Sequence, residues 1–422
     1  MTNQLKQNFK SIKKEYKNLF QNKALMKIIT AGFVSSLGSK ISYFALLKKV
    51  YDLSNGKITN LGFLAIAECL PFIFFGALAG IVIDRFSRKK IMILSDFFSG
   101  FITLSIIFVN NLNLIYLIAF ISAMVNVFRI PAQRSFEPNL VKREDIPLLN
   151  SFIAINNNLV MIVGSALGAA VVGFVGVRNA FIFDSVSFFI SCCIIFTIFI
   201  NEGHLVVNPE NKEVGYLEEF RAGTSIMWKN KTLKLIILID QYVNFTMAMQ
   251  GPLIYILLKQ SFHLGDKAEV AWGILLSSVG VGAVLGSFAI GILVKKHKNK
   301  LRLFLNILIF DSVFFTLFIL NRYFPLSIVL FAFLGCIETA HSIILNSTIQ
   351  SIVPDESRGK VFSAIGMISS PVAILSILIG TTASEIISAK NVLLLVAGLE
   401  ALIAIGVRFT KTYREYENYL EN

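Results

Sequence analysis

The stretch Gly80-Ile-Val-Ile-Asp84-Arg85-Phe-Ser-Arg88-Lys89-Lys90 joins two long apolar runs of the chain. A glycine lets one membrane helix approach another closely, because it has no side chain to hold them apart. The acid and the cations after it can form charge-assisted hydrogen bonds and cap helix ends at the mouth of a helical bundle. We interpret the segment as a latch that holds one conformation; the alternative is that its cations only orient a loop in the membrane. The predicted latch residues are Gly80, Asp84, Arg85, Arg88 and Lys89, braced by Asp96.

Apolar runs of the same kind make up the rest of the chain. Its 422 residues are 55% hydrophobic and 15% charged, with a mean hydropathy of +0.70, which one water-soluble core could not bury. Runs of about 20 apolar residues are long enough to cross a hydrocarbon layer of about 30 Å. They lack the alternation of a membrane β-barrel, so helices are predicted. We place them at 27–50, 61–83, 91–109, 114–136, 149–174, 180–200, 233–257, 270–294, 301–320, 325–347, 361–384 and 392–407.

The basic residues lie mainly in alternate joints between these runs. With the N-terminus, every second joint and the C-terminus assigned to the cytoplasm, 29 of the 39 lysines and arginines are inside and six are outside. This bias orients membrane proteins, so the net charge of +13 indicates no nucleic-acid partner. We expect a multi-pass protein of the bacterial inner membrane with both termini in the cytoplasm.

The chain repeats itself at an offset near 210 residues. Asn22 to Leu25 and Asn230 to Leu233 open corresponding runs 208 positions apart, and Gly62 and Gly273 lie 211 positions apart. Both halves begin on the same side of the membrane, so the repeat is parallel. We therefore predict an all-α membrane protein with twelve transmembrane helices in two parallel six-helix bundles.

The predicted organisation has five parts. A basic, amphipathic N-terminal segment would lie on the anionic inner leaflet. The longest polar joint would link the two bundles and contain a short amphipathic helix. The parts are 1–26 (N-terminal segment), 27–200 (first bundle), 201–231 (cytoplasmic central loop), 232–409 (second bundle) and 410–422 (cytoplasmic tail).

The segment from Gly80 to Lys90 closely resembles the signature loop of the major facilitator superfamily, G-x-x-x-D-R-x-G-R-[RK]. The architecture of that superfamily covers essentially the whole chain, and the resemblance implies transport by alternating access. The sequence departs from the motif at Ser87, where the family prefers glycine. The second-half copy, from Gly291 to Lys300, has Lys295 in place of the acid.

A finer resemblance is to the branch that contains macrolide-efflux proteins and the enterobactin exporter. Its traits are Phe128 to Gln133, Pro138 to Val141, Ser347 to Pro354, Arg358 to Val361, and the glycines Gly273, Gly280, Gly282 and Gly286. Gly164-Ser-Ala-Leu-Gly168 is similar to the G-P-x-L-G core of an exporter motif, with Ser165 in place of proline. Because GxxxG is also a general packing motif of membrane helices, both interpretations stay open.

Ionisable residues inside the apolar runs are candidates for function, because a charge in the bilayer centre is costly. Lys40 lies about fourteen residues, or roughly 21 Å, into its run and needs a carboxylate or water. Its expected partners are Glu68, Asp240 and Glu338. The resemblance implies a cavity lined by helices 1, 4, 7 and 10, which adds Asn244 to the candidates. We predict that Asp240 or Glu338 carries a coupling proton; the alternatives are a static salt bridge with Lys40 and a position at a water-filled edge.

Other polar residues within the runs are less informative. His341 lies one helical turn from Glu338 and is interpreted as a packing residue, with a proton relay as the alternative. Asp184 and Asp311 indicate no particular role. The four cysteines fall within apolar runs without metal-ligand spacing, so we expect neither a metal site nor a disulfide framework.

These features favour a secondary active transporter, specifically a proton-coupled exporter of amphipathic small molecules such as drugs, macrolide-like compounds or siderophores. No phosphate-binding loop is visible, so we expect no ATP use, no cofactor and no enzymatic activity. The expected partners are the substrate, membrane lipid and protons, and we expect a monomer. An uptake carrier or a lipid flippase would use the same scaffold. A non-transporting membrane sensor would need a soluble domain or a charge-free cavity, and neither is indicated.

Overall fold

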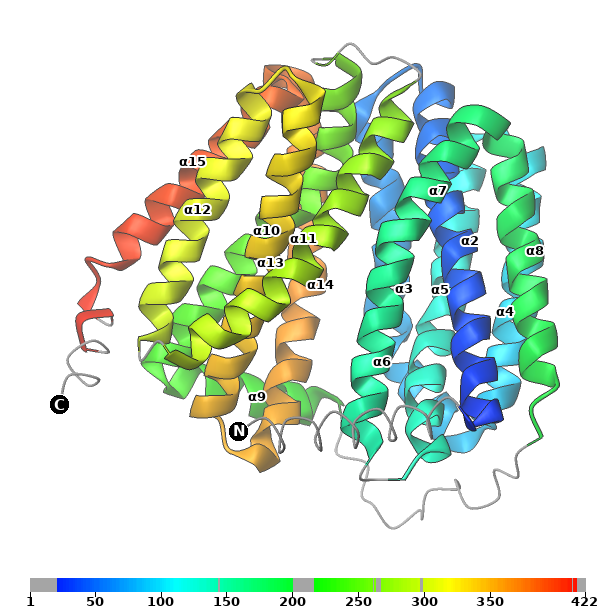
Figure 1. Ribbon diagram of the computed structural model, residues 1–422, viewed down its shortest axis with the longest axis horizontal. Helices are drawn as coiled ribbons and strands as arrows, with labels where there is room; N and C mark the ends of the chain where they lie inside the picture. Colours follow the sequence, from blue (N-terminus) through cyan, green and yellow to red (C-terminus); the bar gives the residue numbers. More distant parts are fainter. Residues whose placement is uncertain are drawn as a thin grey trace, which may run out of the picture. The chain divides into compact units, whose positions relative to one another are not determined.

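The computed structural model describes residues 21–142, 145–199, 216–260, 262, 267–296, 299–411 and 413–415. The regular structure of these residues is helical throughout (Figure 1), which confirms the predicted all-α fold class. The α-helices are α2 (Lys23–Leu53), α3 (Ile58–Arg85), α4 (Arg88–Ser105), α5 (Leu112–Phe136), α6 (Ile146–Leu159), α7 (Ser165–Ala170), α8 (Val177–Phe196), α9 (Tyr216–Lys229), α10 (Lys231–Gln260), α11 (Ala268–Lys296), α12 (Lys300–Leu320), α13 (Phe324–Ile352), α14 (Asp355–Ile387) and α15 (Ala389–Val407). Short 3₁₀ or π-helical turns are η1 (Ile106–Phe108), η2 (Glu137–Leu140), η4 (Val160–Gly164) and η5 (Val171–Val175).

Each predicted apolar run coincides with one helix or one continuous series of helical turns. Within the part of the chain that the structure describes, eleven segments are long and apolar enough to cross a membrane. The predicted run 233–257 is not among the eleven, although α10 is 30 residues long. Its length suffices to span about 30 Å. It differs from the others because its centre carries Asp240, Gln241 and Asn244.

The outward faces of these helices are apolar, and polar groups lie on their inward faces. In α8, Phe183 and Val186 are exposed. Asp184 and Ser187, three positions apart on another face of the same helix, are buried. A helix in water would show the opposite pattern, so this arrangement fits lipid as the surrounding solvent.

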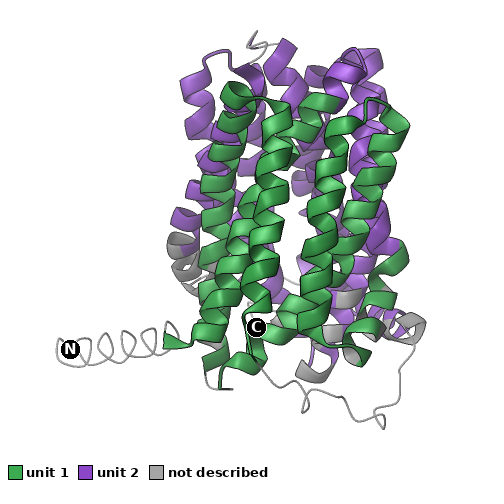
Figure 2. Ribbon diagram, turned by 90° about the vertical axis from the view of Figure 1, so that its right-hand side faces the viewer, with its two compact units in different colours: residues 1–49, 74–210 green, residues 50–73, 211–422 purple. Residues whose placement is uncertain are grey.

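The chain packs as two compact units (Figure 2). The first consists of residues 1–49 and 74–210, and the second of residues 50–73 and 211–422. The break at 210 falls in the predicted central loop, whereas residues 50–73, expected in the first bundle, belong to the second unit. The predicted bundle boundaries therefore stay a prediction. Residues 1–20, 200–215 and most of the predicted tail lie outside the described residues.

Specific contacts attach residues 50–73 to the second unit. The ammonium of Lys259 lies 4.0 Å from the ring centre of Tyr51, a cation–π contact. The backbone N–H of Thr59 donates a hydrogen bond to Glu385 Oε1 at 3.0 Å. The C-terminal end of α2 thus contacts α10, and the N-terminal end of α3 contacts α14.

The amphipathic helix expected in the central loop is α9. It packs along α14, and a side chain at Gly223 would overlap the carbonyl oxygen of Lys360. The indole of Trp228 lies under the ammonium of Lys234, 4.4 Å from the ring centre. These contacts join α9 to the second unit.

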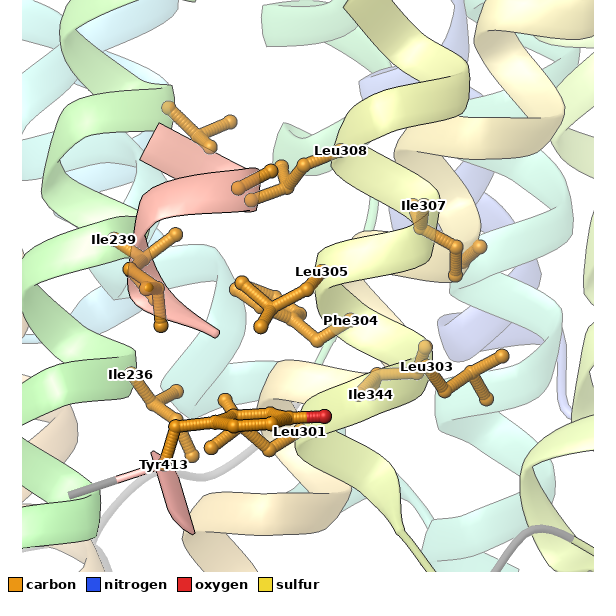
Figure 3. Packing of buried hydrophobic residues seen from close by; sticks show 14 residues of the cluster. Ile236, Ile239, Leu301, Leu303, Phe304, Leu305, Ile307, Leu308, Ile344 and Tyr413 are labelled. Atoms are coloured by element: carbon orange, nitrogen blue, oxygen red, sulfur yellow. The ribbon is translucent and has the colours of Figure 1, made fainter. Parts of the chain in front are cut away.

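The core of the second unit is built around α12. Leu301, Phe304, Leu305 and Leu308 are buried among side chains of neighbouring helices (Figure 3). Helix α12 packs against both α13 and α15. The ring of Phe304 lies 4.7 Å from the ring of His341, centre to centre. This packing positions a polar side chain of α13 inside the unit.

Helices α11 and α13 are in close backbone contact. A Cβ atom at Gly282 would overlap the carbonyl oxygen of Ala332, and one at Gly335 would overlap that of Val279. Small residues permit such approach between membrane helices, where packing replaces the hydrophobic effect as the driving force. The glycine-rich pattern of this run therefore has a structural reason.

Candidate functional site

Ser87 lies in the connection between α3 and α4, where it caps α4. Its hydroxyl accepts a hydrogen bond from the backbone N–H of Lys90 at 3.2 Å, and its φ is −56°. Any residue adopts that angle, so a glycine is not required, and the serine oxygen satisfies a free amide of the helix start. Arg85, at the end of α3, is exposed. The side chain of Asp84 and the surroundings of Gly80 lie outside the described part, so the latch stays a prediction.

Two cations of the predicted latch bind backbone carbonyls of the first unit. Arg88 Nη1 donates to the carbonyl oxygen of Ser135 at 2.7 Å. Lys89 Nζ donates to the carbonyl oxygen of Ile198 at 2.6 Å. Both carbonyls lie at or just beyond the C-terminal end of a helix, which attracts positive charge. These contacts fix the start of α4 against the ends of α5 and α8.

Asp96 and Arg129 form a buried ion pair between α4 and α5, with side chains 0% and 8% exposed. Arg129 also donates to Ser35 Oγ at 3.0 Å and to Gln133 Oε1 at 2.9 Å. Ser191 Oγ donates to Asp96 Oδ2 at 2.5 Å. The network joins α2, α4, α5 and α8. Asp96, expected to brace the latch, contacts Arg129 of α5 and Ser191 of α8.

A second buried polar cluster lies in the second unit. Asp240 is 4% exposed, and its Oδ1 lies 3.1 Å from His341 Nε2. Its Oδ2 accepts hydrogen bonds from the side-chain amides of Gln241 and Asn244, each at 3.1 Å. Ser369 Oγ donates to Gln241 Oε1 at 3.1 Å. His341 Nδ1 has no hydrogen-bond partner among the described residues. The cluster therefore holds a carboxylate against an imidazole with one ring nitrogen still available.

A small cavity of about 70 Å³ lies near this cluster. Two acids line it, Glu338 from α13 and Asp311 from α12. The remaining lining residues are Met247, Gln250, Val279, Phe315, Phe331 and Leu334. The predicted candidate Glu338 thus borders the cavity.

Glu400 of α15 is a buried acid that the sequence patterns did not single out, and it is 1% exposed. Its carboxyl group is hydrogen-bonded to that of Asp311. Its place in the middle of the last apolar run is the signal that could have identified it. His341, which the sequence predicts to be a packing residue, contacts Asp240, and this contact supports the relay alternative.

Lys40 lies where α2 packs against the segment that resembles an exporter motif. A Cβ atom at Gly164 would lie 3.1 Å from Lys40 Cβ, and one at Gly168 would lie 2.8 Å from the carbonyl oxygen of Lys40. The motif is therefore a site of close helix packing. Two π-helical turns, Val160–Gly164 and Val171–Val175, flank α7, and such turns are frequent at functional sites.

The acids expected to pair with Lys40 belong to the second unit, whereas Lys40 belongs to the first. Those pairings, with Glu68, Asp240 or Glu338, stay predictions. Glu68 is half-buried in α3. No group of three or more histidine, cysteine or acidic side chains in the described ranges is arranged to hold a metal ion.

The family model described as Major Facilitator Superfamily matches residues 28–377. The chain belongs to this superfamily. As a facilitator it is a multi-pass membrane transporter of small molecules and not an enzyme.

Similar proteins agree with this assignment. Macrolide efflux protein A of Streptococcus pyogenes is 23% identical over 378 residues, 88% of this chain and 92% of that protein. The putative bacilysin exporter BacE of Bacillus subtilis is 26% identical over 338 residues, 78% and 81% of the two chains. The crystal structure of the nucleoside transporter NupG superposes with a TM-score of 0.74 at 14% identity, covering 91% of this chain and 98% of that chain. The structural likeness shows the facilitator fold, and the expected resemblance to macrolide-efflux proteins is confirmed.

Proposed function

We propose that this facilitator exports amphipathic small molecules, such as drugs, macrolide-like compounds or siderophores, in exchange for protons. Export is supported by the names of relatives that match most of the chain, which include a macrolide efflux protein and a putative bacilysin exporter. The observation that carries proton exchange is the contact of Asp240 with His341 inside the second unit.

This contact has the chemistry that proton exchange needs. A buried carboxylate and an imidazole can pass a proton between them, and histidine titrates near physiological pH. Because an uncompensated charge inside the membrane is costly, gain or loss of a proton at Asp240 biases the helices toward the arrangement that suits the new charge. A ligand that binds the two protonation states unequally then shifts the same equilibrium, which couples substrate to protons.

We propose export as the direction of transport because the two relatives named above are a macrolide efflux protein and a putative bacilysin exporter. An uptake carrier or a lipid flippase would use the same scaffold, and the nucleoside transporter NupG shares the fold. We propose the bacterial inner membrane as the location, with both termini in the cytoplasm and a monomer as the transporting unit. The basic residues of the alternate joints support that orientation.

The test begins with compound accumulation in cells that do or do not produce the protein, screened over drugs, macrolides and siderophores. For a compound that accumulates less, the pH gradient is then dissipated with an ionophore while cellular ATP is held constant. We expect export to stop. Export that continues without a pH gradient would contradict proton exchange, and greater accumulation in producing cells would indicate uptake instead.

A further inference from the structure

We infer that Asp311 and Glu400 share one buried proton and together form a proton-carrying site between α12 and α15. Neither acid is among the coupling candidates recognised in the sequence. Its role in transport rests on the proposed exchange of substrate for protons, whereas the shared proton is a property of the folded chain.

The two carboxyl groups lie within hydrogen-bonding distance of each other. An ionised carboxylate only accepts hydrogen bonds, so a bond between two carboxyl groups requires a proton on one of them. Two ionised carboxylates at such a distance repel strongly, and one of them keeps its proton, as in other acid pairs that share a site. Glu400 is 1% exposed, so water screens that repulsion only weakly.

Neighbouring contacts hold the two helices together at this point. Ser312, next to Asp311, donates its hydroxyl proton to the carbonyl oxygen of Ala397 at 2.6 Å. Ala397 lies one turn before Glu400 on α15. This contact holds α12 and α15 together at the level of the acid pair, so the packing of the two helices keeps Asp311 and Glu400 close to each other.

A proton, and not a basic side chain of the described residues, compensates the negative charge of the acid pair. Among the described residues neither acid forms an ion pair with a lysine or arginine. Within the described ranges, three titratable groups face the pair. His341 and Glu338 of α13 interact electrostatically with Asp311. Tyr242 of α10 interacts electrostatically with Glu400. Glu400 Oε1 has no hydrogen-bond partner in the described part of the chain.

A path for the proton leads from this pair to the cluster around Asp240. Asp311 lines the cavity of about 70 Å³ together with Glu338, and that volume is ample for a water molecule. His341 contacts Asp240 through Nε2 and acts electrostatically on Asp311. The order Asp240, His341, Asp311, Glu400 thus crosses four helices of the second unit, and the acid pair is its buried end.

Infrared spectroscopy of the full chain in lipid nanodiscs tests the shared proton. A protonated carboxyl group has a carbonyl stretch that shifts in D₂O, which separates it from other bands. We expect the parent to show such a band across neutral pH, with a component that belongs to this pair and that the variants identify. Of the two variants Glu400→Gln and Asp311→Asn, the one that replaces the protonated acid should abolish the band. The one that replaces the acceptor should shift the band, because the remaining acid then donates to an amide. Glu415→Gln, at an exposed carboxyl on the C-terminal segment, should leave the band unchanged.

The inference is overturned if the parent lacks the band, or if both variants keep it unaltered while their unfolding temperatures stay near that of the parent. In proteoliposomes, both variants should slow pH-driven export at least tenfold while downhill exchange remains measurable. Variants that lose the band yet export like the parent would refute the transport role. If a pH gradient fails to drive the parent, the proposed function is wrong, and the infrared result still decides whether the pair holds a proton.

Discussion

Arg129 of α5 and Asp96 of α4 form an ion pair inside the first unit, with side chains 8% and 0% exposed. Ser35 and Gln133 accept further hydrogen bonds from the guanidinium, and Ser191 donates to the carboxylate. A buried charge pair is stable only when its other polar atoms are satisfied in this way. The pair therefore holds four helices in one arrangement.

We expect Arg129→Ala to destabilise the protein by about 3–5 kcal/mol, because it leaves the Asp96 carboxylate buried without a partner. Arg129→Lys should keep little of the stability that Arg129→Ala loses, since an ammonium cannot reproduce the planar, branched donor geometry of the guanidinium. Thermal unfolding in detergent measures both effects. The control Arg178→Ala removes an exposed cation of α8 and should change stability by less than about 0.5 kcal/mol. Equal unfolding temperatures for Arg129→Ala and the control would contradict the structural role.

The latch prediction concerns Asp84. We expect Asp84→Asn to reduce transport far more than it reduces the amount of protein in the membrane, because it removes a contact that switches between states and not a packed interior group. Ser87→Gly should be tolerated, since glycine in place of an N-cap serine costs only a few tenths of a kcal/mol. Transport assays at matched expression check both. Unchanged transport in Asp84→Asn would leave the cations as loop anchors only.

The coupling prediction concerns Asp240 and Glu338. We expect Asp240→Asn or Glu338→Gln to abolish export against a gradient while downhill exchange remains, because a permanently neutral group resembles the protonated acid and cannot cycle. Counterflow and gradient-driven export in proteoliposomes separate the two activities. Should both variants concentrate substrate as well as the parent, Glu68 or a sodium-driven mechanism becomes the next hypothesis.

The packing of α11 on α13 leads to a stability prediction. Gly282→Ala should lower the unfolding temperature, because the added methyl group meets the backbone of Ala332 and forces the helices apart. Gly398→Ala in α15 is the matched control. No atom lies within 4 Å of its added Cβ, and alanine favours helix by up to about 1 kcal/mol relative to glycine. If the two variants behave alike, close packing at Gly282 is not needed for stability.

The topology prediction follows from the distribution of lysine and arginine. Reporters inserted in the 201–231 loop and fused after Tyr413 should both report a cytoplasmic location, since 29 basic residues favour that side and six the other. Alkaline phosphatase and green fluorescent protein fusions give opposite signals for the two sides. A periplasmic signal at either site would overturn the assigned number of crossings.

The positions of the helices follow from the amino-acid sequence alone. Twelve apolar runs predicted from length and composition coincide with helical segments, and the amphipathic pattern of the central loop with α9. The reason is local, because a backbone in lipid must satisfy its own hydrogen bonds within each run. The loop from Gly80 to Lys90 likewise indicated the superfamily, since its motif is contiguous in the chain.

Which polar side chains meet depends on how distant helices pack in the folded chain. Asp240 and His341 are 101 positions apart, and a run shows that an acid is buried without showing what it faces. Glu400 lies in an apolar run like the predicted acids, but the run does not show what Glu400 faces. Packing of α12 on α15 brings it to Asp311. The relative rotation of helices is set by side-chain packing between distant segments, such as Phe304 against His341. No local pattern encodes that rotation, so the partners of buried charges emerge only from the fold.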